Sequence, residues 1–256
     1  MLSKKLVRMT ESHTFVVFGA TGSVGSALVR QLTASGNKVI AGVRDLSRGE
    51  ALAAETGCRV LAADAGDSAA IEACVKAGTE ESGGLCGIAN CMGSVLLKPA
   101  HLTSQDEWQQ TLTVNLSSSF MIVQAAAKAL RRSGGSVVLC SSAAARIGLA
   151  NHEAIAAAKA GIIGLTLSAA ATYANRGIRF NAVSPGLVRS EMTRSLWESE
   201  DAAAVSSQMH ALGRLGEPED VAAAIAFLLS PANGWITGQT LGVDGGLSSA
   251  LPRNRR

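Results

Sequence analysis

The sequence predicts an α/β protein built on one doubly wound parallel sheet, and three observations carry that prediction. Short apolar runs alternate with helical patterns along almost the whole chain. The first runs are apolar throughout, as strands buried on both faces require. The length of 256 residues and the hydrophobic content of 47% suit one large domain better than two small ones. We therefore expect a single domain over residues 1–256, without a linker or an internal repeat.

The first expected strand covers residues 14–18 and runs directly into a glycine-rich turn at residues 19–25. A helix from Ser26 to about Ser35 and a second strand from Lys38 to Val43 complete a βαβ unit. Glycine lets the backbone approach a pyrophosphate, and the helix N-terminus supplies amide donors and positive potential. The spacing predicts a Rossmann-type dinucleotide site, with these candidate contacts: Gly19, Thr21, Ser23, Val24 and Gly25.

The end of the second strand bears on the choice of dinucleotide. An acidic residue there binds the ribose 2′-hydroxyl of NAD, whereas an arginine accommodates the 2′-phosphate of NADP. Val43 and Arg44 therefore favour NADP(H). Asp45 follows immediately and leaves NAD open, and the other interpretation of Arg44 is a solvated surface side chain.

The alternation continues to the end of the chain. Further strands are expected at residues 59–63, 87–90, 136–139, 179–183 and 240–243, and helices at 68–76, 104–130, 151–174 and 218–229. Right-handed crossovers place the carboxyl ends of parallel strands along one edge, where ligands bind. A polar segment of low periodicity, about 187–216, is the expected lid over a small-molecule substrate.

Composition and charge exclude several classes of function. A net charge of +3 is too small to indicate nucleic-acid binding. Five scattered cysteines without a CxxC pair argue against a zinc site or disulfides and for a reducing compartment. The basic stretch from Met1 to Thr14 lacks the apolar core of a signal peptide, and no apolar run of membrane-spanning length is evident. We expect a cytoplasmic protein without a metal, nucleic-acid or membrane partner.

The order of the motifs resembles the short-chain dehydrogenase/reductase family over about residues 14–246. The turn at residues 19–25 resembles the family's TGxxxGxG pattern, but Phe18-Gly19 replaces Thr-Gly and Ser23 replaces the middle glycine. Asn90-Cys91-Met92-Gly93 keeps half of the Asn-Asn-Ala-Gly motif. The remaining landmarks match the family's adenine-contacting aspartate, its active-site asparagine, its Pro-Gly turn and the contacts after that turn: Asp64, Asn115, Pro185-Gly186, Val188 and Ser190.

The resemblance implies an NAD(P)-dependent oxidoreductase that assembles as a dimer or tetramer through its long helices. In the family a serine binds the substrate oxygen, a lysine binds the nicotinamide ribose, an asparagine holds a water, and a tyrosine is the general acid. Ser142, Lys159 and Asn115 stand at the matching positions, whereas Ile155 stands where the tyrosine should be. Tyr173 lies fourteen residues beyond Lys159, too far along the same helix to replace it, and is interpreted as packing.

His152 is the candidate replacement for the missing proton donor. On a helix with Asn151 as its N-cap, His152 and Lys159 lie about 20° apart around the axis and about 10.5 Å along it. An imidazole donates a proton readily near neutral pH. The other interpretation is a histidine at a helix start that bonds to the local backbone.

The leading hypothesis is an NADPH-dependent reductase of a small carbonyl, or of an activated C=C or C=N bond. Its catalytic set would be Ser142, His152, Lys159 and Asn115. The second class is a cofactor-binding protein without turnover, a sensor or scaffold, which Ile155 favours. The third is a non-redox lyase or dehalogenase on the same fold. In such a protein we would expect the glycine-rich phosphate turn to be lost, whereas residues 19–25 keep most of it.

Overall fold

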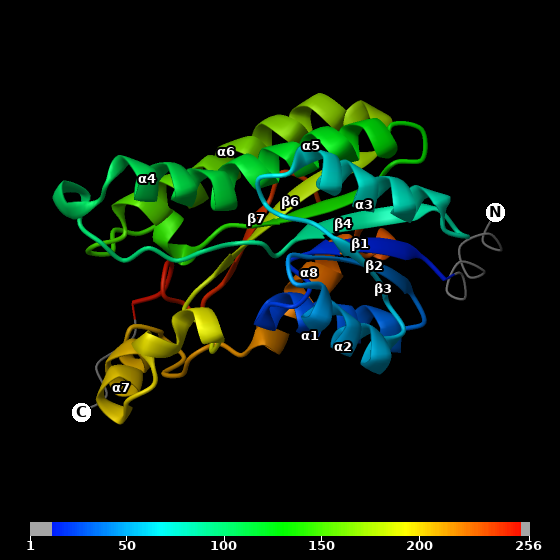
Figure 1. The fold of residues 1–256 in the computed structure, drawn as a ribbon. Coiled ribbons are helices and arrows are strands. Elements are labelled where there is room, and N and C mark those ends of the chain that lie inside the picture. The colour runs from blue at the N-terminus through cyan, green and yellow to red at the C-terminus, as the bar shows by residue number, and fades with distance from the viewer. Residues whose placement is uncertain (1–11, 252–256) are drawn as a thin grey trace.

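The computed structural model describes residues 12–251, which form one seven-stranded parallel sheet in the order β3-β2-β1-β4-β5-β6-β7 (Figure 1). This arrangement confirms the predicted fold class. The strand order reverses between β1 and β4, so the crevice at their carboxyl ends is a topological switch point, where such sheets bind ligands. The strands are β1 (Thr14–Phe18), β2 (Lys38–Val43), β3 (Arg59–Ala62), β4 (Leu85–Asn90), β5 (Gly135–Cys140), β6 (Ile178–Pro185) and β7 (Thr240–Val243).

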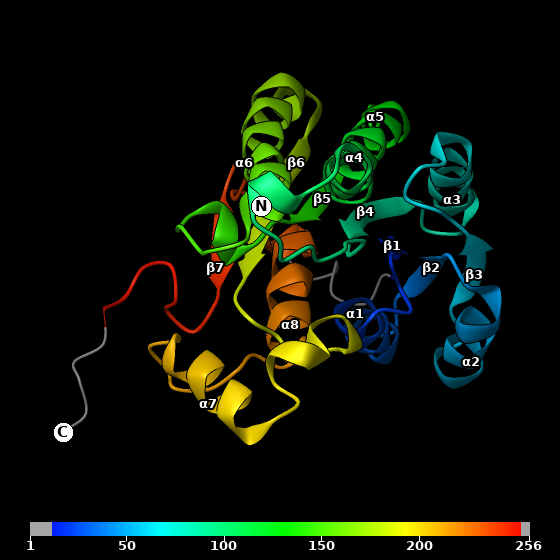
Figure 2. The ribbon, with the colours of Figure 1, turned by 60° about the vertical axis from the view of Figure 1, so that its left-hand side comes forward.

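Helices cover both faces of the sheet (Figures 1 and 2). One face carries α3 (Ser68–Glu80), α5 (Ser118–Ala129) and α6 (Glu153–Tyr173), which bury an apolar cluster around Phe18 and Phe180. The opposite face carries α1 (Ser23–Ala34), α2 (Leu46–Thr56) and α8 (Pro218–Leu229), which bury a second cluster around Phe15 and Val17. Val16 and Phe18 of β1 thus pack into one cluster and Phe15 and Val17 into the other, which explains why the strand is apolar from Phe15 to Phe18.

The long helix expected over residues 104–130 is present, but a π-helical turn divides it into two α-helices. It begins as α4 (Gln105–Leu112), capped by Ser104, and continues as α5 after a π-helical turn at Thr113–Ser117. The π turn includes Asn115, and such turns occur frequently at functional sites. It is a feature that the sequence pattern did not indicate.

The expected N-cap of α6 is wrong by one residue. Asn151 has a left-handed φ of 62°, and His152 is the residue that precedes the first helical turn. The backbone carbonyl of Asn151 accepts a 2.8 Å hydrogen bond from the amide of Lys98, which holds Asn151 in the loop. Asparagine is among the few residues that adopt this conformation readily.

The segment at residues 187–216 contains more regular structure than its sequence pattern indicated. It forms a 3₁₀ helix at Glu191–Leu196 and α7 (Glu200–Gln208), capped by Ser190 and Ser199 respectively. Figures 1 and 2 show α7 standing away from the sheet beyond the carboxyl ends of its strands. The base of the segment is closed by a bridge between Val188 and Gly216.

The expectation that no apolar run reaches membrane-spanning length is also corrected. Residues 153–176, which comprise α6 and the turn after it, are long and apolar enough to cross a bilayer. This helix packs on β6, and its Ile162, Ala169 and Ala170 belong to the buried cluster, as in the interior helix of a globular fold. The expectation about a leader concerns residues that, up to residue 11, lie outside the described part of the chain.

Candidate dinucleotide and active site

The glycine-rich turn at residues 19–25 packs closely against the backbone of the loop after β4. Gly19 has a φ of 69°, and a Cβ placed there would lie 2.7 Å from the carbonyl carbon of Cys91. A Cβ on Gly25 would collide with the carbonyl oxygen of Gly19. The N-cap residue of α1 is Gly22, which offers no side-chain cap, and the first turn of the helix carries no acidic residue. The next helix, α2, is capped by Asp45. The first amides of α1 are therefore left to an anion such as a pyrophosphate.

The end of β2 presents positive charge toward this turn. The Asp45 carboxylate accepts hydrogen bonds from the amide and hydroxyl of Ser47 and from the amide of Arg48. The hydroxyl of Ser47 and then the amide of Arg48 hold the pKa of Asp45 below its usual value. Arg44 is exposed, and the Arg48 guanidinium donates a 3.1 Å hydrogen bond to the carbonyl of Thr21. Sequence reasoning missed Arg48, although its place in the first turn of a helix capped by Asp45 was a usable signal.

Two further predicted cofactor contacts have defined surroundings. Asp64 is exposed after β3 and accepts a 2.9 Å hydrogen bond from the amide of Gly66. Asn90 is buried at the end of β4, where it donates to the Ser119 hydroxyl and accepts from the amide of Met92, both at 3.0 Å. The side-chain amide of Asn90 therefore fixes the start of the loop after β4.

Asn115 and Lys159 meet on either side of Gly93. A Cβ on Gly93 would lie 3.3 Å from Asn115 Oδ1 and 3.5 Å from Lys159 Nζ. Asn115 is fully buried; its Oδ1 accepts from the amide of Ser94 at 3.1 Å, and its Nδ2 donates to the Ser94 hydroxyl and the Thr111 carbonyl at 3.0 Å each. Sequence reasoning missed Ser94, whose only signal is its position directly after the Asn90-to-Gly93 motif.

Lys159 and Ser142 are joined through the end of β5. Lys159 Nζ donates a 2.8 Å hydrogen bond to the carbonyl of Cys140, and the Ser141 hydroxyl donates a 2.8 Å bond to the carbonyl of Lys159. Burial lowers the pKa of Lys159, whose side chain is enclosed. Ser142 comes next, half-buried, with its hydroxyl accepting from the amide of Ala144 at 3.2 Å. The structure thus brings Asn115, Ser142 and Lys159 to one edge of the sheet.

His152 and Ile155 occupy different environments on α6. His152 Nδ1 lies 2.7 Å from the carbonyl oxygen of Ala150, which is the local backbone contact that the sequence left as an alternative. Among the described residues, His152 makes no hydrogen bond to Ser142 or Lys159. Ile155 is 5% exposed, so the position of the family's tyrosine is filled by a buried apolar side chain.

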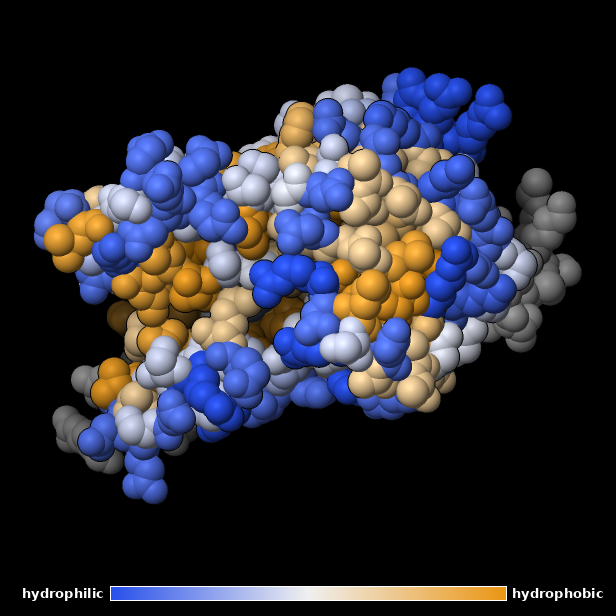
Figure 3. Space-filling view, in the orientation of Figure 1, coloured by the Kyte–Doolittle hydropathy of each residue, from blue (hydrophilic) through white to orange (hydrophobic). Residues whose placement is uncertain are grey.

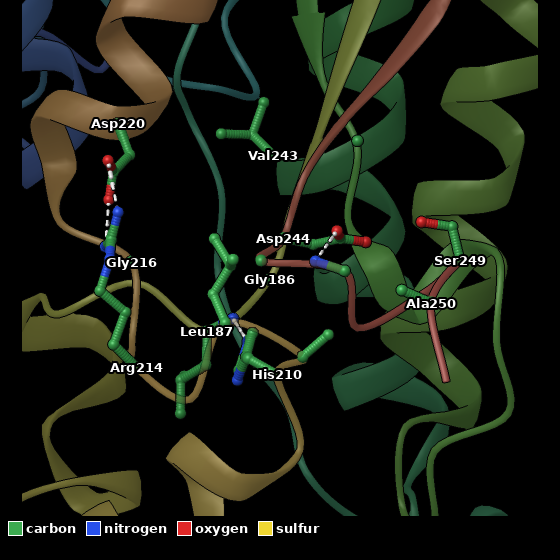
Figure 4. A pocket seen from close by; sticks show the side chains of 15 residues that line it. Gly186, Leu187, His210, Arg214, Gly216, Asp220, Val243, Asp244, Ser249 and Ala250 are labelled. Atoms are coloured by element: carbon green, nitrogen blue, oxygen red, sulfur yellow. Dashed lines mark hydrogen bonds and ion pairs between the residues drawn. The ribbon is translucent and has the colours of Figure 1, made fainter. Parts of the chain in front are cut away.

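The turn after β6 borders a cavity of about 500 Å³ (Figure 4). Pro185 ends β6, and the amide of Leu187 donates a 3.1 Å hydrogen bond to Nε2 of the buried His210. Because Nε2 accepts, Nδ1 carries the proton and donates to the carbonyl of Ser206 at 2.9 Å. The ring therefore ties the turn to α7. The cavity is lined by Gly186, Leu187, His210, Asp244 and their neighbours, and not by Asn115, Ser142 or Lys159.

The predicted contacts in the lid segment have structural partners of their own. Val188 is buried and pairs with Gly216, and the Ser190 hydroxyl accepts from the amide of Thr193 at 3.3 Å. Figure 3 shows a hollow between the end of the molecule that carries α4 and the part that carries α7, with apolar surface on its upper wall. This hollow opens at the carboxyl edge of the sheet, where the substrate is expected.

Comparisons with known proteins find relatives that match this chain over most of its length. A family model described as enoyl-(acyl carrier protein) reductase matches residues 19–248. D-threitol dehydrogenase of Mycolicibacterium smegmatis is 34% identical over 237 residues, which are 90% of this chain and 91% of that protein. The 3-oxoacyl-[acyl-carrier-protein] reductase of Vibrio cholerae is 34% identical over 240 residues, 93% of this chain and 98% of that protein. The structure of a short-chain type dehydrogenase/reductase from Mycobacterium ulcerans superposes with a TM-score of 0.89 at 28% identity, covering 93% of this chain and 90% of that one.

Proposed function

This chain belongs to the short-chain dehydrogenase/reductase family of oxidoreductases, and from that premise we propose that it is an NADPH-dependent reductase whose proton donor is not a tyrosine. The substrate is a small molecule with a carbonyl or an activated C=C or C=N bond. The names of the relatives support both bond types, since one is a 3-oxoacyl reductase and the matching family model is described as an enoyl reductase.

One observation carries the proposal. The Asn115 amide and the Lys159 amine converge on Gly93, and Lys159 is tied through Cys140 to the strand end that presents Ser142. A buried amine costs free energy unless it has partners or a function. A protein that only binds the dinucleotide would use Lys159 but would not need Ser142 and Asn115 at the same edge of the sheet. The presence of all three therefore favours an enzyme over a scaffold.

The phosphate turn and the end of β2 support NADP(H) as the cofactor. Gly19 to Gly25 and the uncapped start of α1 would hold the diphosphate, and Lys159 would hold the nicotinamide ribose. Asp45 is occupied by capping α2, which leaves Arg44 and Arg48 to meet a 2′-phosphate. NADPH, when bound, supplies a hydride.

The remaining task of the protein is to stabilise and protonate the negative charge that hydride addition builds on the substrate. The Ser142 hydroxyl donates a hydrogen bond to that charge. His152 supplies the proton from Nε2, because the carbonyl of Ala150 engages Nδ1. The pair formed by Asn115 and Ser94 orients a water beside Lys159.

The test follows the absorbance of NADPH during incubation with a panel of diketones, enones and imines. The expected result is oxidation of NADPH with at least one substrate, slowed by about 10²–10⁴ in Ser142→Ala. Tight NADPH binding without oxidation of any substrate would instead support the second class, a dinucleotide-binding sensor or scaffold. Ile155 is the specific observation that keeps this class in consideration.

Assembly and compartment are part of the same proposal. Phe120 on α5 and Leu167 on α6 are 51% and 55% exposed, so apolar side chains remain on the two long helices through which we propose a homodimer or homotetramer. Light scattering at micromolar concentration tests it, and a monomeric mass would contradict it. We place the enzyme in the cytoplasm, which fractionation of the cells would check.

A further inference from the structure

Two cysteines stand side by side at the edge of the sheet that carries the candidate site. Asn90 of β4 pairs with Leu139 of β5, so the next residues, Cys91 and Cys140, are neighbours across the two strands. The amide of Cys91 donates a 2.9 Å hydrogen bond to the carbonyl of Phe18, so the chain still follows the sheet at that residue. Neighbouring strands lie about 4.8 Å apart, which brings the two Cα atoms to about that distance.

Both thiols point to the same face of the sheet. Asn90 and Leu139 face α5 and its cluster, and because side chains alternate along a strand, Cys91 and Cys140 face the other way. Both pack against the cluster on the α1 face, together with Val24 and Val188. Val24 and Val188 are candidate cofactor contacts, and a Cβ on Gly19 of the phosphate turn would lie 2.7 Å from the carbonyl carbon of Cys91. The pair therefore borders the proposed dinucleotide site.

The pair differs from the other cysteines of the chain. Cys58 and Cys74 are buried, whereas Cys91 and Cys140 keep partial exposure. Cys86 is also partly exposed, but it lies five residues earlier on β4, about 16 Å away along the strand. Cys86 packs against the same cluster as Cys91 and Cys140, because the register of β4 shifts near its start. It is therefore a matched single thiol on that face of the sheet.

The surroundings limit the chemistry of the pair. Burial, and then the nearby Cys140 thiol, raise the pKa of Cys91, while Lys159 opposes this increase. Burial likewise raises the pKa of Cys140, so both groups are thiols at neutral pH. A disulfide needs Cβ atoms about 3.5–4.5 Å apart, closer than parallel side chains on neighbouring strands stand without distortion. An atom that bridges the two sulfurs needs neither a thiolate nor a short Cβ–Cβ distance, provided that it reacts with neutral thiols.

We propose that Cys91 and Cys140 form a two-thiol site that binds trivalent arsenic compounds, and that its occupation excludes the dinucleotide. In the balanced reaction an arsenoso compound, R–As=O, condenses with both thiols. Two As–S bonds form, two S–H bonds and the As=O bond break, and the oxygen leaves with both protons as water. No electron is transferred. The exclusion of the dinucleotide rests on the proposed function, whereas the binding of arsenic does not.

The experiment uses phenylarsine oxide and the full chain. Intact-mass measurement should show one adduct, heavier by phenylarsine oxide less one water, that 2,3-dimercaptopropanol removes and that excess 2-mercaptoethanol leaves in place. Cys91→Ser and Cys140→Ser should each abolish this monothiol-resistant adduct, while Cys86→Ser should retain it. In the wild-type protein, tandem mass spectrometry should find the peptides of Cys91 and Cys140 joined through arsenic, a measurement that does not depend on the folding of any variant.

A second measurement tests the competition. Saturating NADPH should slow adduct formation at least tenfold, and the adduct should bind NADPH at least tenfold more weakly than the unmodified protein. An adduct that joins other cysteines, or that persists in Cys140→Ser, would overturn the two-thiol site. An adduct at these two residues that leaves NADPH affinity unchanged would overturn the exclusion. Failure of the unmodified protein to bind any dinucleotide would count against the proposed function, and the mass measurement would still decide the arsenic site.

Discussion

Asn115 and Ser94 hold each other by two hydrogen bonds, one from the amide of Ser94 to Asn115 Oδ1 and one from Asn115 Nδ2 to the Ser94 hydroxyl. The π turn around Asn115 and the loop after β4 are thereby locked together beside Lys159. Asn115 lies in the π turn and Ser94 in the loop after β4, so the two residues meet only because both segments reach the same edge of the sheet.

Replacing Asn115 should damage both stability and turnover. Asn115→Ala leaves the amide of Ser94 and the carbonyl of Thr111 without their partner, which should cost about 1–3 kcal/mol of unfolding free energy. Loss of the oriented water should lower kcat by about 10²–10⁴. Urea unfolding and steady-state kinetics measure the two effects. Ser94→Ala, which keeps Asn115 bonded to Thr111, is the milder control; equal losses in both variants would contradict the special role of Asn115.

The two arginines near the phosphate turn should set cofactor preference. Arg44→Ala and Arg48→Ala should each weaken NADPH binding about ten- to a hundredfold and leave NADH binding unchanged, since a charge-assisted phosphate contact contributes about 1.5–3 kcal/mol. Titration calorimetry with both dinucleotides checks this. Arg59→Ala, which removes an exposed arginine paired with Glu81, is the control. Equal affinity of the unmodified protein for NADPH and NADH would exclude a 2′-phosphate site.

His152→Ala should lower the rate of reduction by about 10²–10⁴, and Ser142→Ala should do comparable damage. Because the protonated imidazole is the proposed donor, the rate should be lower at pH 8 than at pH 6. Ile155→Tyr should not be needed for activity. Near-full activity of His152→Ala together with a flat profile from pH 6 to 8 would assign the proton to water held by Asn115 and Lys159.

Lys159 should make the stability of the protein depend on pH in the alkaline range. Burial lowers its pKa on folding, so between the folded value and the unfolded value of 10.5 the unfolded chain binds more protons, and stability increases with pH. Lys159→Met lacks this proton exchange. The unfolding free energy of the natural protein should therefore rise relative to Lys159→Met from neutral pH toward pH 10, as measured by urea titration at each pH. A difference in unfolding free energy between the two proteins that stays constant with pH would show that folding does not shift the pKa of Lys159.

The alternation of apolar runs and helical patterns predicted the parallel sheet, and β2 was predicted with its observed bounds. Such strands are predictable because burial on both faces demands apolar residues at every position. Two helix starts, α3 at Ser68 and α8 at Pro218, match the prediction. Two others do not: α1 begins at Ser23, three residues before the predicted Ser26, and the N-cap of α6 is His152 rather than Asn151. In α6 a hydrogen bond from Lys98, distant in the chain, decided the conformation of Asn151.

For the candidate site, the sequence by itself determined which residues follow the strand ends: Ser142 after β5, Asn90 at the end of β4 and Arg44 after β2. Connection rules for parallel sheets require these ends to share one edge. Only the tertiary structure decided which side chains touch there. The Asp45 carboxylate caps α2, Arg48 binds the carbonyl of Thr21, Ser94 pairs with Asn115, and Cys91 lies beside Cys140. The physical reason is range: apolar periodicity is a local property of the chain, whereas a hydrogen bond or a thiol pair between two elements depends on the register in which they pack.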